Sequence, residues 1–526
     1  MGELSQDSPQ TAAPSPAWLR RIFTAPLRYA ALFNRLQTDR LLMIAQTRSI
    51  EAHRGLLPRY EYLLFLLAAV IVSLVTVRLE SSLLLLLLAA AVLLAGCTLS
   101  PACLRTWPYL FVSAALLVPP LYPSILGGET PVYVANLLFL AGCLTVLARG
   151  ADLRIGEDSV GRAAAGFIFA TALSIPFGFW LSGTSAGLGS CLRFILLLHP
   201  FLIYLWLRSF RPVYRDELLI PAGKFLLGLG VVAAVYGIID FYVPIPIPHP
   251  FAAQYIYLDG RVIRRAQGML YEASSFGNLS AFFLSLTLVI LLSWWQKLST
   301  VSKATLYAMA GIFTAALFLS YSRGSWANVL VTMTVFLILR RKLQLRLAAA
   351  SLLVVPAFVY LVYQISPLVV LNFFNWRMGT LLEFWSDPNL ATSGRWESWW
   401  RLISFFADHP WYLIFGIGYK TLPHTDLFGR SLIADNGFLS LTFEAGIIGL
   451  AAFLWLNQTV FSATYRASQQ QDSVRAIGAA FMFAFWCGEM IQMITGDLFT
   501  FWRNMVVFFA TLALVQAAPE RPTNQS

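Results

Sequence analysis

The stretch FGNLSAFFLSLTLVILLSWW, residues 276–295, decides the fold, because it places twenty side chains in a row without a charge. A helix of this length and composition crosses the hydrocarbon core of a bilayer. Similar runs recur along the chain, of whose 526 residues 58% are hydrophobic and 12% are charged. Soluble proteins carry about a quarter charged residues. The sequence therefore predicts a polytopic membrane protein and excludes a soluble one.

Helical spans account for most of the chain. About fourteen apolar runs are long enough to cross a bilayer, which takes roughly 20 residues each. We therefore expect an all-α polytopic membrane protein with about fourteen transmembrane helices. The predicted spans are residues 60–77, 81–99, 107–126, 131–147, 163–181, 191–207, 218–243, 276–295, 304–320, 325–339, 347–365, 437–461, 474–494 and 501–517.

Basic residues predict the orientation of these spans. The segment up to Arg59 holds eight arginines, and alternate short loops after it are also basic. The intervening loops 127–130, 182–190 and 495–500 hold neither Lys nor Arg. Because Lys and Arg in short loops stay cytoplasmic, both termini are expected inside. The same bias explains the net charge of +11 without nucleic acid as a partner.

This topology divides the chain into five regions. Two segments on the outside are too long for simple turns, and long structured loops commonly carry function. In residues 18–50, arginines alternate with apolar side chains, which fits an interfacial helix or an ordinary solvated one. The regions are a cytoplasmic basic segment (1–59), spans one to eleven with the external loop 244–275 (60–365), a large periplasmic loop (366–436), spans twelve to fourteen (437–517) and a cytoplasmic tail (518–526).

No metal or cofactor site is predicted. The five cysteines contain no Cys-x-x-Cys pair, and the outer segments lack an Asp-x-Asp or a carboxylate cluster that could hold Mg²⁺. The cysteines are interpreted as small buried apolar side chains.

Arginines at the outer ends of spans are candidates for anion binding. Arg323 lies in the corner Ser322-Arg323-Gly324, where Gly324 is expected to permit the turn. Arg264 and Arg265 lie in the external loop, against the general charge bias. A guanidinium group presents five donors to an anion, so these residues suit a phosphate group. The alternative is an interfacial arginine that binds lipid head groups.

The large outer loop combines an amphipathic helix with many tryptophans. The segment from Gly394 to Phe406 has helical periodicity and ends before His409-Pro410. The same loop holds six of the 16 tryptophans, which are Trp376, Trp385, Trp396, Trp399, Trp400 and Trp411. Aromatic faces stack on sugar rings, so the loop suits a glycan. An aromatic belt at the membrane interface is the alternative.

The loop closes with Asp435-Asn436, after which the next span carries Glu444, Gly446 and Gly449. Such a pair at a helix start is a common N-cap, and it could equally serve chemistry. Gly416 and Gly418 mark a tight turn rather than a phosphate-binding loop.

Taken in order, these elements resemble the O-antigen ligase and Wzy-type polysaccharide polymerase superfamily over residues 260–460. The matching elements are Arg265, Gly268 and Glu272; Ser322, Arg323 and Gly324; Gly394, Arg395 and Trp399; Pro410, Gly416 and Gly418; and Asn436, Leu439, Glu444, Gly446 and Gly449. Members are integral-membrane glycosyltransferases of GT-C-like architecture that use glycans linked to polyprenyl diphosphate.

The resemblance implies roles for particular residues. Catalysis would involve Asp435, Glu272 and Arg323, and the diphosphate would be bound by Arg264, Arg265, Arg323 and Arg395. The glycan would contact Trp396, Trp399, Trp400, Asn436 and His424. The proton acceptor would be Asp435, with His424 and Glu272 as rival candidates. The chemistry would be metal-independent and would require no cofactor.

The resemblance also implies the reaction and its location. Ligases that act on lipid A typically carry His before the Asn, whereas this chain has Asp435, which favours a polymerase. The expected product is a surface polysaccharide or exopolysaccharide made at the periplasmic face of the bacterial inner membrane. The expected partners are the undecaprenyl-diphosphate-linked glycan, the lipid bilayer and chain-length or export machinery. A ligase or a lipid-linked oligosaccharide flippase remains an alternative, although no internal repeat typical of a transporter is evident.

Overall fold

The structure is a computed structural model. It describes residues 101–118, 133–149, 158–209, 212–243, 255–258, 261–270, 272–340, 379–428, 434–470 and 473–516, with a few residues between 360 and 375 and Leu432. The predictions for residues 1–59, for the spans 60–77 and 81–99, for most of the span 347–365, for the tail and for Trp376 lie outside these residues.

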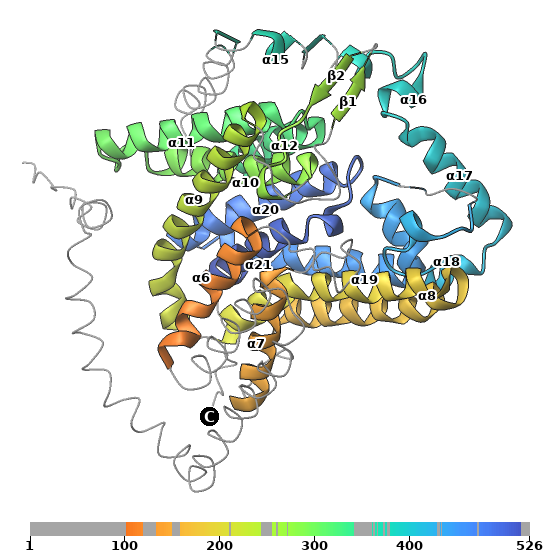
Figure 1. Ribbon diagram of the computed structural model, residues 1–526. Coiled ribbons are helices and arrows are strands. Elements are labelled where there is room, and N and C mark those ends of the chain that lie inside the picture. The colour runs from red at the N-terminus through yellow and green to blue at the C-terminus, as the bar shows by residue number, and fades with distance from the viewer. Residues whose placement is uncertain are drawn as a thin grey trace, which may run out of the picture.

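Helices make up nearly all of the described chain (Figure 1). The long helices are α6 (Pro101–Leu117), α7 (Val134–Arg149), α8 (Ser159–Ser209), α9 (Pro212–Tyr242), α10 (Ala273–Trp294), α11 (Thr300–Leu319), α12 (Arg323–Leu339), α17 (Arg395–Asp408), α19 (Gly437–Ser468), α20 (Val474–Gln492) and α21 (Trp502–Val515). The short ones are η2 (Gly268–Leu270), α15 (Pro367–Leu371), η4 (Gly379–Leu381), α16 (Pro388–Ala391), α18 (Tyr412–Phe415), η5 (Leu422–His424) and η6 (Leu498–Thr500).

The apolar helices indicate a multi-pass membrane protein. Within the described residues, 6 helices are long and apolar enough to cross a bilayer, and α6, α7, α12 and α21 contain shorter apolar helices. Helix α8 is two helices joined at Gly183, whose φ of 83° breaks the helical path. The predicted loop 182–190 is therefore helical apart from this break. The count of about fourteen spans stays a prediction.

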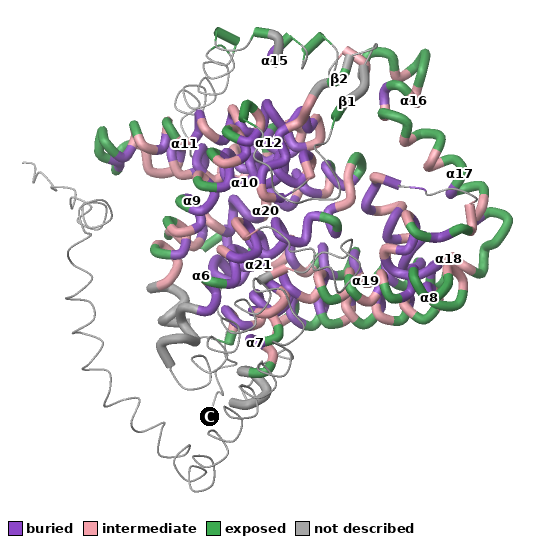
Figure 2. Tube along the Cα trace, viewed as in Figure 1, coloured by how far each residue is buried: buried purple, intermediate pink, exposed green. Residues whose placement is uncertain are grey.

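Helix α10 lies at the centre of the bundle, and 89% of its apolar 18-residue stretch is buried inside the protein. Its Phe282 packs against Phe481 and Phe485 of α20 and Phe508 of α21. Figure 2 shows buried residues concentrated in α10, α12, α20 and α21, whereas α17 presents much exposed surface. A helix that is apolar on every side lies either in a protein core or in lipid, and α10 contacts α9, α11, α12 and α20.

One part of the external loop 244–275 is a β-hairpin. Strand β1 (Tyr255–Leu258) pairs antiparallel with β2 (Arg261–Arg264), with Tyr255 opposite Arg264 and Leu258 opposite Arg261. The other described elements are helical, as the all-α prediction has it, and this short hairpin is an addition to it. The hairpin matters for the site because β2 leads directly into Arg265.

Glycines let backbone segments approach closely where the loop 366–436 meets α8 and α19. A Cβ added to Gly446 would lie 2.2 Å from the carbonyl oxygen of Ile414, and one on Gly416 would lie 2.4 Å from that of Glu444. A Cβ on Gly418 would similarly lie 2.4 Å from the Cα of Gly178 in α8. Gly416, Gly418 and Gly446 all have positive φ, which glycine alone adopts without strain. The end of the outer loop is thereby packed directly against α8 and α19, which lie side by side in Figure 1.

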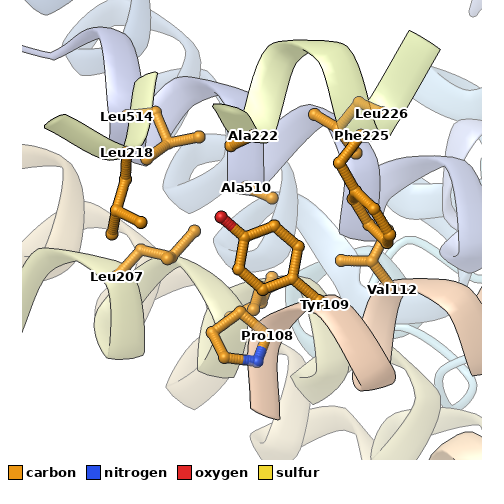
Figure 3. Close-up of a pocket in the computed structure, with 11 residues that line it drawn as sticks. Pro108, Tyr109, Val112, Leu207, Leu218, Ala222, Phe225, Leu226, Ala510 and Leu514 are labelled. Carbon is orange, nitrogen blue, oxygen red and sulfur yellow. The ribbon is translucent and has the colours of Figure 1, made fainter. Parts of the chain in front are cut away.

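An apolar pocket lies between α6, α8, α9 and α21 (Figure 3). Its lining includes Tyr109, Leu207, Leu218 and Leu514 and none of the predicted site residues. It therefore belongs to the packing of the bundle rather than to the candidate site.

Candidate active site

Three helices begin at the candidate site, and the predicted motifs that contain Glu272, Arg323 and Asn436 lie at these starts. Glu272, Ser322 and Asn436 are the N-cap residues of α10, α12 and α19. Electrostatic interactions connect Arg265 with Glu272, Arg323, Arg395 and Asp435. A helix N-terminus carries partial positive charge, so three of them beside arginines favour an anion.

Arg265 is fixed between two of these helix starts. Its Nε donates to the carbonyl oxygen of Ser320 at 2.8 Å, and its Nη2 donates to Ser274 Oγ at 3.4 Å. Burial lowers the pKa of Arg265 to about 10, and Glu272 opposes this decrease. The guanidinium therefore stays charged at neutral pH.

Arg264, its neighbour, lies in a different environment. Its Nη2 forms an ion pair with Asp240 at 3.3 Å, and its Nη1 donates to the carbonyl oxygen of Phe241. These contacts hold Arg264 against α9. The structure thus brings Arg265, and not Arg264, into the group that surrounds Glu272.

Arg323 connects α12 to the outer loop. Its guanidinium donates to Thr380 Oγ1 at 3.1 Å, to the carbonyl oxygen of Ala391 at 2.9 Å and to Ser393 Oγ at 3.2 Å. The turn before it differs from the prediction, because the residue with positive φ is Tyr321, at 51°. Gly324 instead lies inside α12, where a Cβ would meet Thr495 Oγ1 at 2.7 Å. Its small size serves helix packing.

Arg395, the first residue of α17, pairs with Asp435. Both Nε and Nη2 of Arg395 lie 3.0 Å from Asp435 Oδ2. Nearby, Trp399 Nε1 donates to the carbonyl oxygen of Ala434 at 2.5 Å. These contacts hold Asp435 in a left-handed conformation with a φ of 43°. The predicted helix and its end at His409 are confirmed.

Glu272 has the electrostatic environment of a proton acceptor. Burial, followed by the charge of Asp435, raises the pKa of its carboxyl group to about 8, and Arg265 partly opposes this increase. As the N-cap of α10, its side chain accepts no capping hydrogen bond. A carboxyl group that titrates close to neutral pH can exchange a proton during a reaction.

The predicted glycan contacts divide into buried and exposed side chains. Asn436 caps α19 by accepting from the backbone N–H groups of Phe438 and Leu439. Trp399 is committed to Ala434, whereas Trp396 and Trp400 are 44% and 64% exposed on the outer side of α17. His424 contacts Arg193, and burial together with that cation lowers the pKa of His424.

Sequence reasoning missed Lys420 and Asp497, which form an ion pair between side chains that are each 11% exposed. Lys420 Nζ also donates to Thr500 Oγ1 at 3.2 Å, and both charges act on Glu272. Arg193, which donates to the carbonyl oxygen of Lys420 at 2.7 Å, extends this group toward α8. Arg193 lies at the outer end of a predicted span, against the charge bias, and that signal could have identified it.

The described residues contain no group of three or more His, Cys, Asp or Glu side chains arranged to hold a metal ion. The charged groups that do converge are arginines, one lysine and separate carboxylates. This donor set suits an anionic ligand better than a divalent cation.

The fold is that of a multi-pass membrane protein, and arginines and carboxylates lie at or next to the starts of several of its helices. Residues 308–454 match the O-antigen ligase family, which confirms the resemblance to the O-antigen ligase and Wzy-type superfamily. The matched segment contains Arg323, Arg395, Asp435 and Asn436, whereas Arg265 and Glu272 precede it. A comparison with curated proteins found no match. Members of this family are glycosyltransferase-like ligases and polymerases, so the match supports, at the coarse level, an enzyme of this type.

Proposed function

We propose that the protein polymerises oligosaccharide repeat units linked to undecaprenyl diphosphate, at the periplasmic face of the bacterial inner membrane. The observation that carries this proposal is the electrostatic interaction of Arg265 with Arg323, Arg395, Glu272 and Asp435, all of which lie at or next to helix starts. The arginines match a diphosphate, and the carboxylates match the proton that an acceptor hydroxyl must lose.

In the proposed reaction, an acceptor hydroxyl attacks the anomeric carbon of the donor sugar, and the bond to the diphosphate oxygen breaks. Negative charge develops on that bridging oxygen, where prearranged arginines lower the barrier without a metal ion. Direct displacement inverts the anomeric centre. The hydroxyl proton passes to Glu272 or Asp435, and polyprenyl diphosphate leaves with both bonding electrons.

Depth in the membrane supports the same assignment. The donor's polyprenyl tail stays in the bilayer, so its diphosphate must be bound at the membrane surface. Arg323 is the first residue of the apolar helix α12, so it lies at one end of that helix. The loop that Arg323 contacts would cover the site and exclude water that could hydrolyse the donor. Trp396 and Trp400 would then stack on the glycan.

Two alternatives differ in the acceptor or in the reaction. A ligase would transfer the glycan to another lipid or acceptor, and Asp435 in place of His favours the polymerase. A flippase would move the lipid-linked glycan without breaking its bond to the diphosphate. Arg264 would have to leave Asp240 before it could join the diphosphate site.

Arginine substitutions test the diphosphate site. We expect Arg265→Ala and Arg323→Ala to lower transfer from a synthetic polyprenyl-diphosphate oligosaccharide by at least about 100-fold, since each removes preorganised charge stabilisation. Arg401→Ala is the matched control, because Arg401 pairs with Glu397 on the exposed side of α17. Transfer is measured in nanodiscs as glycan product per folded protein. Near-normal transfer by Arg265→Ala or Arg323→Ala would remove that residue from the site.

A further inference from the structure

A second polar cluster lies inside the helix bundle and takes no direct part in the proposed chemistry. Asn278 of α10, Asn328 of α12, Glu489 of α20 and Asn504 of α21 are each 0% exposed, and Gln492 of α20 is 4% exposed. Burying polar side chains among membrane helices costs free energy, so such residues usually serve a function.

Helix α20 uses this cluster to hold α10 and α12 together. Glu489 Oε1 accepts from the side-chain amides of Asn278 at 2.6 Å and Asn328 at 2.7 Å. Gln492 Oε1 accepts from the same two amides at 3.0 and 3.2 Å. Two neighbouring helices are thus tied to one pair of acceptors, which fixes their relative rotation and depth.

The cluster extends to the start of α12, next to Arg323. Gln492 Nε2 donates to Ser325 Oγ at 3.2 Å, and Ser325 Oγ is hydrogen-bonded to Ser322 Oγ at 2.8 Å. Ser322 is the N-cap of α12 and directly precedes Arg323. A displacement of Gln492 would therefore reach the helix start that carries this arginine.

The cluster also extends to the start of α10, next to Glu272. Asn504 Nδ2 donates to the carbonyl oxygen of Ser275 and to Asn278 Oδ1, both at 2.8 Å. Ser275 lies in the first turn of α10, which Glu272 caps. One network thus reaches the helix starts that carry Glu272 and Arg323.

Glu489 is bound by amide groups rather than by a cation. Its Oε2 and Asn504 Oδ1 are buried and have no hydrogen-bond partner among the described residues. Holding a carboxyl group in this way adds little net free energy, whereas its directional bonds specify one arrangement of helices.

We propose that Asn278, Asn328, Glu489 and Gln492 are positioning residues that fix Glu272 relative to Arg323. The consequence for catalysis rests on the proposed function: the carboxyl group that accepts the proton and the arginine that binds the diphosphate act on the same donor. The hydrogen-bond network inside the bundle would set the separation of these two groups.

The test compares Asn328→Leu with Asn457→Leu. Asn457 is 5% exposed and accepts from Trp486 Nε1 at 2.8 Å, between α19 and α20. Both variants lose buried amide bonds, but only Asn328 belongs to the network. In nanodiscs, hydrogen exchange should accelerate in Asn328→Leu at residues 272–278 and 322–328, and should stay at the wild-type rate there in Asn457→Leu.

Transfer kinetics supply the second readout. We expect Asn328→Leu to lower kcat/KM for the polyprenyl-diphosphate donor by about tenfold or more per folded protein, because small misplacements of reacting groups are costly. Asn457→Leu should keep the wild-type value. Glu489→Gln, which retains an acceptor oxygen, should keep at least half of the wild-type kcat/KM, whereas Glu489→Leu should not.

Unchanged exchange at both helix starts in Asn328→Leu would overturn the proposal, whatever the activity. Parallel losses of kcat/KM in Asn328→Leu and Asn457→Leu would also overturn it, because the effect would then be general destabilisation. If the wild-type protein transfers no glycan, the proposed function fails, while hydrogen exchange still decides whether the network holds the two helix starts.

Discussion

At the residue scale, Glu272 couples the candidate site to pH. Burial raises the pKa of its carboxyl group to about 8, so the base form increases as pH rises through that value. We expect the transfer rate to rise from pH 6.5 through about 8 and to level off about one pH unit above that pKa. Glu272→Gln should lower the rate by about 10²–10⁴-fold and remove this rise.

The control for this profile is Glu397→Gln, because Glu397 is exposed and forms an ion pair with Arg401, one turn further along α17. It should keep the wild-type rate and pH dependence. A wild-type rate that is flat across this pH range, or a Glu272→Gln variant with normal turnover, would assign the proton to another group such as Asp435.

At the scale of elements, the break in α19 is the feature on which the outer loop depends. Gly446 has a φ of 73°, and a Cβ there would lie 2.2 Å from the carbonyl oxygen of Ile414. We expect Gly446→Ala to destabilise the protein by about 2–4 kcal/mol, since it combines backbone strain with overlap. Thermal unfolding in nanodiscs measures the change.

Gly228→Ala is the matched control, because Gly228 lies in α9 and a Cβ there would meet nothing within 4 Å. Alanine in such a helix position should be neutral or stabilising by up to about 1 kcal/mol. Equal midpoints for Gly446→Ala and the wild type would mean that the close approach of α18 and α19 is not needed.

At the scale of the whole molecule, the sequence predicted the helices well because apolar length is a local property. Spans 276–295, 304–320 and 474–494 correspond closely to α10, α11 and α20. The hairpin β1–β2 was missed, although Asp259-Gly260 between its strands is a recognised hairpin signal. Helix continuity through residues 184–190 was also missed, because this stretch is rich in Gly and Ser, a composition typical of a loop.

The site was predicted only in part, because side-chain partners depend on distant segments. The sequence could not distinguish Arg265 from Arg264, whose different environments arise from Ser320 and Asp240. Similarly, Lys420 and Asp497 lie far apart in the chain and meet only in the folded bundle. Charge and spacing identified the arginine-bearing motifs, whereas tertiary packing decides which of them meet.

One measurement tests the central claim most directly. Purified wild-type protein in nanodiscs is given a synthetic undecaprenyl-diphosphate oligosaccharide in the presence of EDTA, and lipid-linked products are separated by size. Polymerisation without a metal predicts a ladder of products that grow by one repeat unit at a time. A donor that stays intact, with or without added acceptors and divalent cations, would contradict the claim and favour a flippase.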